Sequence, residues 1–194
     1  MTCIRTCWIA IAIALVHPVK ANENRPPIPL VEERVGRFGI VVPSGESEKT
    51  LEAANLLKEI LEKCTGASVA IAREASAAGN LEIVVASEKV FPNPTPEEAT
   101  KLTLNNQQWW SMKSKGSQIW LTGNDAGMRT GTRDAVVMFL EDVVGARFFH
   151  FGRNGQVLPE SKSVVFSSPD KTIIPDSGYR ALYPYHQGKI DMTS

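Results

Sequence analysis

The sequence predicts an α+β fold, a two-layer sandwich in which two main helices pack on one face of a mixed β-sheet. Two segments carry apolar residues at helical spacing, and the other apolar runs are short, β-branched and bounded by Gly or Pro. The expected order is strand, helix, strand, strand, hairpin, helix, strand, strand. This order has too few helices for a sheet in which helices and parallel strands alternate throughout.

The first 21 residues have the pattern of a signal peptide. Arg5 precedes an uncharged apolar run from Trp8 to Val16, and Val19-Lys20-Ala21 offers small residues for cleavage after Ala21. The run is shorter than the about 20 residues that a membrane span needs. We therefore predict a secreted or periplasmic protein without membrane contact after cleavage; an uncleaved N-terminal anchor is the alternative.

Cleavage changes the charge and the cysteine content. Removing Arg5 and Lys20 from the 21 basic residues leaves 19 against 21 acidic ones, so the mature chain is slightly acidic. Nucleic-acid binding favours a basic face, so no nucleic-acid partner is predicted. Cys3 and Cys7 also leave, which excludes an intramolecular disulfide. The remaining Cys64 lies on an apolar helix face, where a small buried side chain is expected.

The N-terminal half of the mature chain predicts one helix between short strands. Residues 22–35 are polar and Pro-rich at their start and are expected to form a flexible lead-in to a domain over 36–168. Ser47 is placed to cap a helix with apolar residues at helical spacing, and Gly66 is placed to end it. The strands expected around this helix are Phe38–Val42, Ser68–Ala72 and Leu81–Ala86.

The C-terminal half predicts a hairpin and a second helix. Asn124 or Asp125 is expected to cap this helix, and Gly145 to end it. Gly127 and Gly131 would then lie on one face of its first turns, which indicates a backbone packed closely on the sheet. The strands expected here are Gln107–Lys113 and Gln118–Leu121, joined across Ser114-Lys115-Gly116, and Ser163–Ser167.

Several short motifs between Phe38 and Ser167 recur in a recognisable order. They are Thr65-Gly66 at the end of the first helix, Gly123, Gly127, Phe139-Leu140-Glu141, Gly145 and the aromatic pair Phe148-Phe149. In this order and spacing the chain resembles the N-terminal accessory domain of bacterial alpha-glucuronidase-type glycoside hydrolases. A related fold precedes the barrel in beta-N-acetylhexosaminidases.

The resemblance implies a domain that lies ahead of a (β/α)₈ barrel, with the catalytic carboxylates in the barrel. Residues 169–194, with Pro175 and Tyr179-Arg180, resemble the bridge into such a barrel. The implied partner is therefore a catalytic barrel domain that is missing or separately encoded, and a polysaccharide would be met through it. The resemblance makes the chain a hydrolase by family and implies no catalytic residue within it.

The residues themselves also predict no catalytic, metal or cofactor site. After cleavage the histidines are His150 and His186, and neither a His-Glu-x-x-His nor a Cys-x-x-Cys spacing occurs. Glu141 and Asp142 are adjacent on the predicted helix and would point about 100° apart, so they cannot flank one glycosidic bond. We expect them to form a solvated face.

Aromatic residues are the remaining candidates for a ligand site. Alternation along a strand would turn one ring of Trp109-Trp110 inward and the other outward, where it could stack on a sugar. Tyr179, Tyr183 and His186 form a second aromatic group in the tail. The alternative is that these rings pack in the core or against a partner domain. The alternative function is a stand-alone secreted carbohydrate-binding or protein-interaction module.

Overall fold

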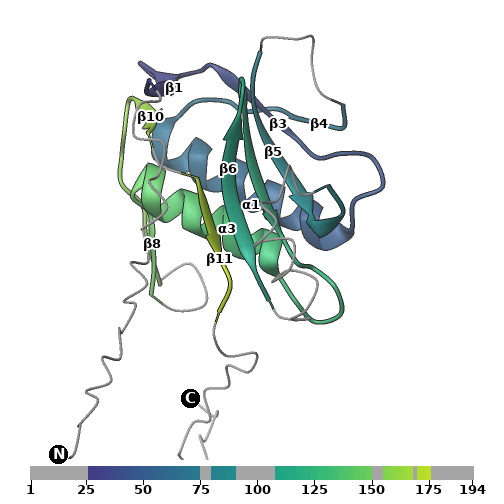
Figure 1. Cartoon of the computed structure of the whole chain (residues 1–194). Coiled ribbons are helices and arrows are strands. Elements are labelled where there is room, and N and C mark those ends of the chain that lie inside the picture. Colours follow the sequence, from purple (N-terminus) through teal and green to yellow (C-terminus); the bar gives the residue numbers. More distant parts are fainter. Residues whose placement is uncertain (1–25, 75–79, 91–107, 150–154, 168–169, 176–194) are drawn as a thin grey trace, which may run out of the picture.

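A computed structural model describes residues 26–74, 80–90, 108–149, 155–167 and 170–175 (Figure 1). Within these ranges, a six-stranded mixed sheet has helices α1 (Glu48–Thr65) and α3 (Gly131–Phe139) on one face, which confirms the predicted fold class. The sheet order is β11 (Lys171–Ile173), β6 (Trp110–Lys115), β7 (Gln118–Gly123), β5 (Leu81–Ser87), β3 (Phe38–Val41) and β4 (Ile71–Ala72). Strands β3, β4, β5 and β7 are parallel, whereas β6 and β11 add one antiparallel pair each.

Helix α1 (Glu48–Thr65) has the bounds that its caps predict. The Ser47 hydroxyl accepts a hydrogen bond from the amide of Thr50, and Gly66 ends the helix with φ of 72°. This left-handed conformation costs glycine little, and the Gly66 amide satisfies the carbonyl of Glu62 at 2.8 Å. The prediction for this helix is confirmed at both ends.

Helix α3 (Gly131–Phe139) begins later than predicted. Its N-cap is Thr130, and the expected start at Asn124 or Asp125 is wrong because the chain first makes a loop in which Gly127 has φ of 63°. Gly127 and Gly131 therefore do not share a helix face. The helix continues into a π-helical turn, η2 (Leu140–Val144), and ends at Gly145 in the predicted left-handed conformation.

The close approach predicted for Gly127 and Gly131 occurs only at Gly131, which lies at the start of α3 against Gly123 at the end of β7. A Cβ on Gly123 would lie 2.0 Å from the carbonyl carbon of Gly131, and one on Gly131 would lie 2.3 Å from the carbonyl oxygen of Trp109. No side chain fits at such distances. The two glycines therefore let the helix start directly against the strand ends.

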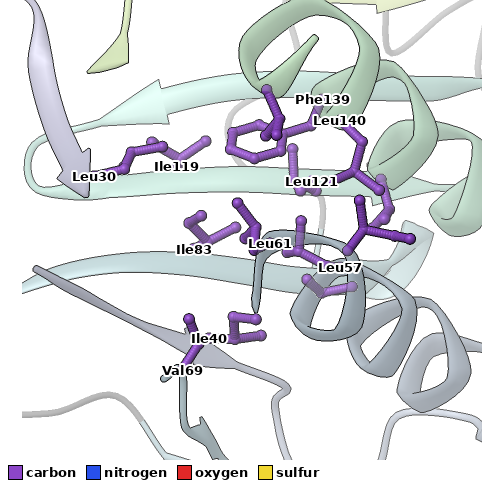
Figure 2. Packing of buried hydrophobic residues seen from close by; sticks show 14 of the residues in the cluster. Leu30, Ile40, Leu57, Leu61, Val69, Ile83, Ile119, Leu121, Phe139 and Leu140 are labelled. Atoms are coloured by element: carbon purple, nitrogen blue, oxygen red, sulfur yellow. The ribbon is translucent and has the colours of Figure 1, made fainter. Parts of the chain in front are cut away.

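The main core lies between the sheet and the two helices (Figure 2). Leu57 and Leu61 of α1 meet strand residues such as Ile83, and Phe139 of α3 is fully buried beside them. A second, smaller cluster lies on the opposite face of the sheet, where alternation along the strands places every second side chain. It consists of Val41, Val84 and Ala86, with Trp120 packed against them.

The flexible lead-in expected over residues 22–35 contains ordered structure. Strand β1 (Ile28–Glu32) forms a three-stranded sheet with β2 (Val35–Gly36) and β10 (Val164–Phe166), and both Leu30 and Val31 are fully buried. The prediction is wrong here because β1 pairs with a strand more than 130 residues away, Ile28 opposite Phe166, which the local composition does not reveal.

Smaller differences concern strand ends and the C-terminal segment. The predicted bridge over 169–194 begins with strand β11, so its first residues belong to the main sheet. The hairpin turn lies at Gly116-Ser117, because β6 extends to Lys115. Of the strand expected at Ser68–Ala72, only β4 forms. The remaining short elements are η1 (Glu88–Val90), β8 (Arg147–Phe148) and β9 (Gln156–Val157).

The predicted signal peptide, residues 1–21, lies outside the described residues. In the part of the chain that the structure describes, neither helix has the length and apolar composition needed to cross a bilayer.

Candidate functional site

The aromatic pair proposed for ligand binding lies at the start of β6. Trp109 is 4% exposed, and its carbonyl accepts a hydrogen bond from the amide of Asn124 at 3.0 Å. Trp110 is half-buried, packs against the main core and pairs with Gly123 and Ile173 on the neighbouring strands. Thus Trp109 lies in the interior and Trp110 at its margin. The tail candidates Tyr179, Tyr183 and His186 lie outside the described residues.

A third tryptophan lies on the face of the sheet opposite the helices. Trp120 stands between Val84 and Lys113 of the adjoining strands and packs on the second apolar cluster. Its indole nitrogen is buried without a hydrogen-bond partner, and so is the hydroxyl of Thr122 on the same face. Buried polar groups are usually satisfied by protein or water, so this face holds two donors able to pair with an oxygen.

The densest polar arrangement lies at the carboxyl ends of the parallel strands. The ammonium of Lys49, in the first turn of α1, donates to the carbonyls of Asp125, Gly127 and Arg129 at 3.2, 2.5 and 3.1 Å. An ammonium has three donors, so these bonds use its full capacity. A single side chain of α1 thereby holds the loop that leads into α3.

Asp125 connects the same loop to three other elements. One carboxylate oxygen accepts from the amide of Thr132 at 2.9 Å, and the other accepts from the hydroxyl of Thr50 at 3.3 Å. The backbone amide of Asp125 donates to Glu88 at 3.0 Å. The sequence predicts Asp125 only as a possible cap and makes no prediction for Lys49, because the partners of Lys49 lie 76 or more positions later in the chain.

A cleft of about 310 Å³ lies next to this network, between the first turns of α1 and α3. Its walls carry both charge signs, with the exposed Arg133 and Glu52 on opposite helices. The six lining residues are Lys49, Glu52, Leu56, Asp125, Thr130 and Arg133. The cleft can hold a small polar molecule.

The cysteine and the acidic side chains outside this cleft lie in surroundings that give them structural roles. Cys64 is buried, and its burial raises the pKa of the thiol, so it remains protonated and unreactive. Asp142 forms an ion pair with Lys171 at 2.7 Å, as expected for a surface group, and Glu141 is half-buried next to it. Among the described residues, no group of three or more His, Cys, Asp or Glu side chains could hold a metal ion.

No protein-family model matches the chain, and no curated protein matches it. Among solved structures, the chain is similar to a GH138 enzyme targeting pectin rhamnogalacturonan II, with 15% identity and a TM-score of 0.32. It is also similar to CpGH84D, with 16% identity and a TM-score of 0.35.

Both structural neighbours are glycoside hydrolase family proteins, and both are much longer than this chain. The similarity covers 54% of the chain and 13% of the GH138 enzyme, and 61% of the chain and 19% of CpGH84D. The chain thus spans less than a fifth of either neighbour. The activity named for the GH138 enzyme is a property of that protein.

Proposed function

We propose that the chain is an exported, non-catalytic accessory domain of a carbohydrate-active glycoside hydrolase of the alpha-glucuronidase type. The observation that supports the proposal is the position of the residues that carry the resemblance. Most of them, such as Thr65, Phe139 and Leu140, lie in the framework of the fold, whereas Gly127 and Phe149 are exposed. A sequence motif made of framework residues points to a shared domain, whereas one made of exposed reactive groups would point to a shared reaction.

The framework role can be followed residue by residue. The Thr65 hydroxyl donates to the carbonyl of Leu61 at 2.7 Å and accepts from the amide of Ala67 at 3.1 Å, next to the left-handed Gly66. Phe139 is fully buried in the core, and Gly145 ends η2 with φ of 84°. Thr65, Gly66 and Gly145 thus end helical segments, and Phe139 fills the core.

In this proposal the catalytic carboxylates belong to a barrel domain that acts on the polysaccharide, and this chain supports that domain. The test is an assay of the purified chain on aryl-glucuronides and aryl-N-acetylglucosaminides. We expect no release of the aryl group above the buffer rate. Turnover that copurifies with the folded chain and disappears when the chain is unfolded would show a catalytic site and overturn the proposal.

Export is part of the proposal and has its own test. Protein recovered from the medium or the periplasm should begin at Asn22, after cleavage behind Ala21. N-terminal sequencing measures this directly, and a chain that begins at Met1 would contradict cleavage.

The alternative function is a stand-alone carbohydrate-binding module, and Trp110 favours it because this residue is only partly covered by the fold. Trp109, Tyr179, Tyr183 and His186 would be its further ligand contacts. Titration with uronic-acid oligosaccharides, followed by tryptophan fluorescence, tests this function. Binding that Trp110→Phe abolishes and Trp109→Phe preserves would support it, and no binding by the wild-type chain would exclude it for these sugars.

A further inference from the structure

The loop between β7 and α3, residues Asn124–Thr130, is held largely by residues from other elements. Its internal hydrogen bonds join Asn124 to Ala126 and Ala126 to Arg129. The carbonyls of Asp125, Gly127 and Arg129 instead converge on the Lys49 ammonium. Besides the hydrogen bonds of Asp125 to other elements, the loop is therefore held by a lysine that lies 76 or more positions earlier in the chain.

Converging carbonyls require a cation. Each carbonyl oxygen carries a partial negative charge, and three of them directed at one point repel each other unless a positive group lies between them. The ammonium supplies that charge and one donor for each oxygen. Gly127, whose carbonyl is one of the three, has φ of 63° in this closed loop.

We propose that Lys49 is a latch that keeps the Asn124–Thr130 loop closed and thereby fixes the cleft between α1 and α3. Lys49, Asp125 and Thr130 each line the 310 Å³ cleft, so the latch and two residues of the loop it holds are also parts of its wall. Release of the latch would move Asp125 and Thr130 away from α1 and open the cleft around the exposed Arg133. This inference is independent of the proposed function.

The latch also explains how the loop keeps its conformation although the apolar side chain at its tip is exposed. Met128 is 98% exposed at the tip of the loop, where no burial of its own side chain could hold the backbone in place. The hydrogen bonds of Lys49 on either side of it, to Gly127 and Arg129, supply that restraint. The loop is thus ordered from its base, and not by packing of its tip.

Hydrogen exchange measured by mass spectrometry tests the latch with Lys49→Met. This substitution keeps the length of the aliphatic stem and removes the charge and all three donors. The amides to follow are those of Asp125, Ala126, Arg129, Gly131 and Thr132, which are all hydrogen-bonded in the closed loop. We expect them to exchange about tenfold faster or more, because charged hydrogen bonds are lost. Peptides from β5 and β7 should keep their protection.

The matched control is Lys58→Met on the same helix. Lys58 is half-buried like Lys49, and it pairs with Glu62 at 3.9 Å on the helix surface. This variant should exchange like the wild type. Lys49→Gln, which retains two donors without charge, should give intermediate exchange in the loop and serves if Lys49→Met does not fold.

Two results would overturn the latch. In the first, the loop amides of Lys49→Met or Lys49→Gln keep wild-type protection, which would mean that the loop is held by its own turns and by the hydrogen bonds of Asp125. In the second, protection falls equally in the loop and in the central strands, which would make Lys49 a contributor to global stability without a local function.

Discussion

Helices α1 and α3 cover the same face of the sheet, but their N-terminal ends are held in different ways (Figure 1). At α1, the hydroxyl of Ser47 accepts from the amide of Thr50, three residues later. At α3, the N-cap Thr130 makes no side-chain capping bond, and the carboxylate of Asp125 accepts from the amide of Thr132 instead. Asp125 in turn is bonded to Thr50 of α1.

The difference shows that residues close in sequence fix the start of α1, whereas residues from other elements fix the start of α3. The cap of α1 is complete within its own first turn. The start of α3 requires the loop from Asn124, the hydrogen bonds of Lys49 and the close contact of Gly131 with Gly123. Changes near the start of α3 should therefore disturb more of the molecule than equivalent changes at α1.

The largest effect is expected from Gly131→Ala, because the added methyl group would clash with the backbone that Gly131 packs against. The added Cβ would meet the carbonyl oxygen of Trp109 at 2.3 Å, and backbone cannot move aside as a flexible side chain can. We expect a loss of about 3 kcal/mol or more in the free energy of unfolding, measured in urea. The matched control is Gly39→Ala in β3, where a Cβ meets nothing within 4 Å. Equal losses in both variants would contradict the close contact.

Asp125→Ala should have the next largest effect, because it removes the distant cap of α3. The buried amide of Thr132 and the hydroxyl of Thr50 would each lose a partner, at an expected cost of about 2 kcal/mol. Asp142→Ala is the control, since its ion pair with Lys171 is at the surface and should contribute less than about 1 kcal/mol. Urea unfolding of the two variants measures the difference. A smaller loss for Asp125→Ala than for Asp142→Ala would show that the network at the strand ends does not stabilise the fold.

Ser47→Ala tests the local cap and should cost less, about 1 kcal/mol. The lost acceptor served the Thr50 amide in a first turn that is partly open to solvent, so water can replace it. Thermal unfolding followed by circular dichroism provides the measurement. If Ser47→Ala destabilised the protein more than Asp125→Ala, the proposed contrast between the two helices would be reversed.

The same contrast explains what the sequence could predict. The bounds of α1, the strands Phe38–Val41 and Leu81–Ser87 and the placement of two helices on one face follow from patterns within about 20 residues. The start of α3 and strand β1 do not, because each depends on partners far along the chain, such as Phe166 for Ile28. For the same reason the local sequence could not predict the role of Lys49. It did indicate Asp125 as a possible cap and Gly131 as a position of close backbone approach.

The smallest effect is expected on the thiol reactivity of Cys64, in the last turn of α1. This reactivity shows whether a disturbance at α3 reaches α1. Its thiol is buried with a raised pKa, so the folded wild type should not react with an aromatic disulfide reagent at neutral pH. If loss of the α3 cap leaves α1 intact, Cys64 should remain unreactive in the folded Asp125→Ala variant as well. Rapid labelling of that native variant would mean that the loss of the α3 cap opens α1 too.

The raised pKa also fixes the sign of a pH effect. Because the folded state favours the protonated thiol, its contribution to stability is present below the ordinary pKa of about 8.5 and is lost as the pH rises through that value toward the folded pKa. The wild type should therefore lose slightly more stability than Cys64→Ala between neutral and alkaline pH. Urea unfolding of both proteins at pH values on either side of the ordinary pKa measures this difference. If Cys64→Ala lost more stability than the wild type, the Cys64 thiolate would be stabilised in the folded protein. That result would contradict the burial of Cys64 away from water at the end of α1.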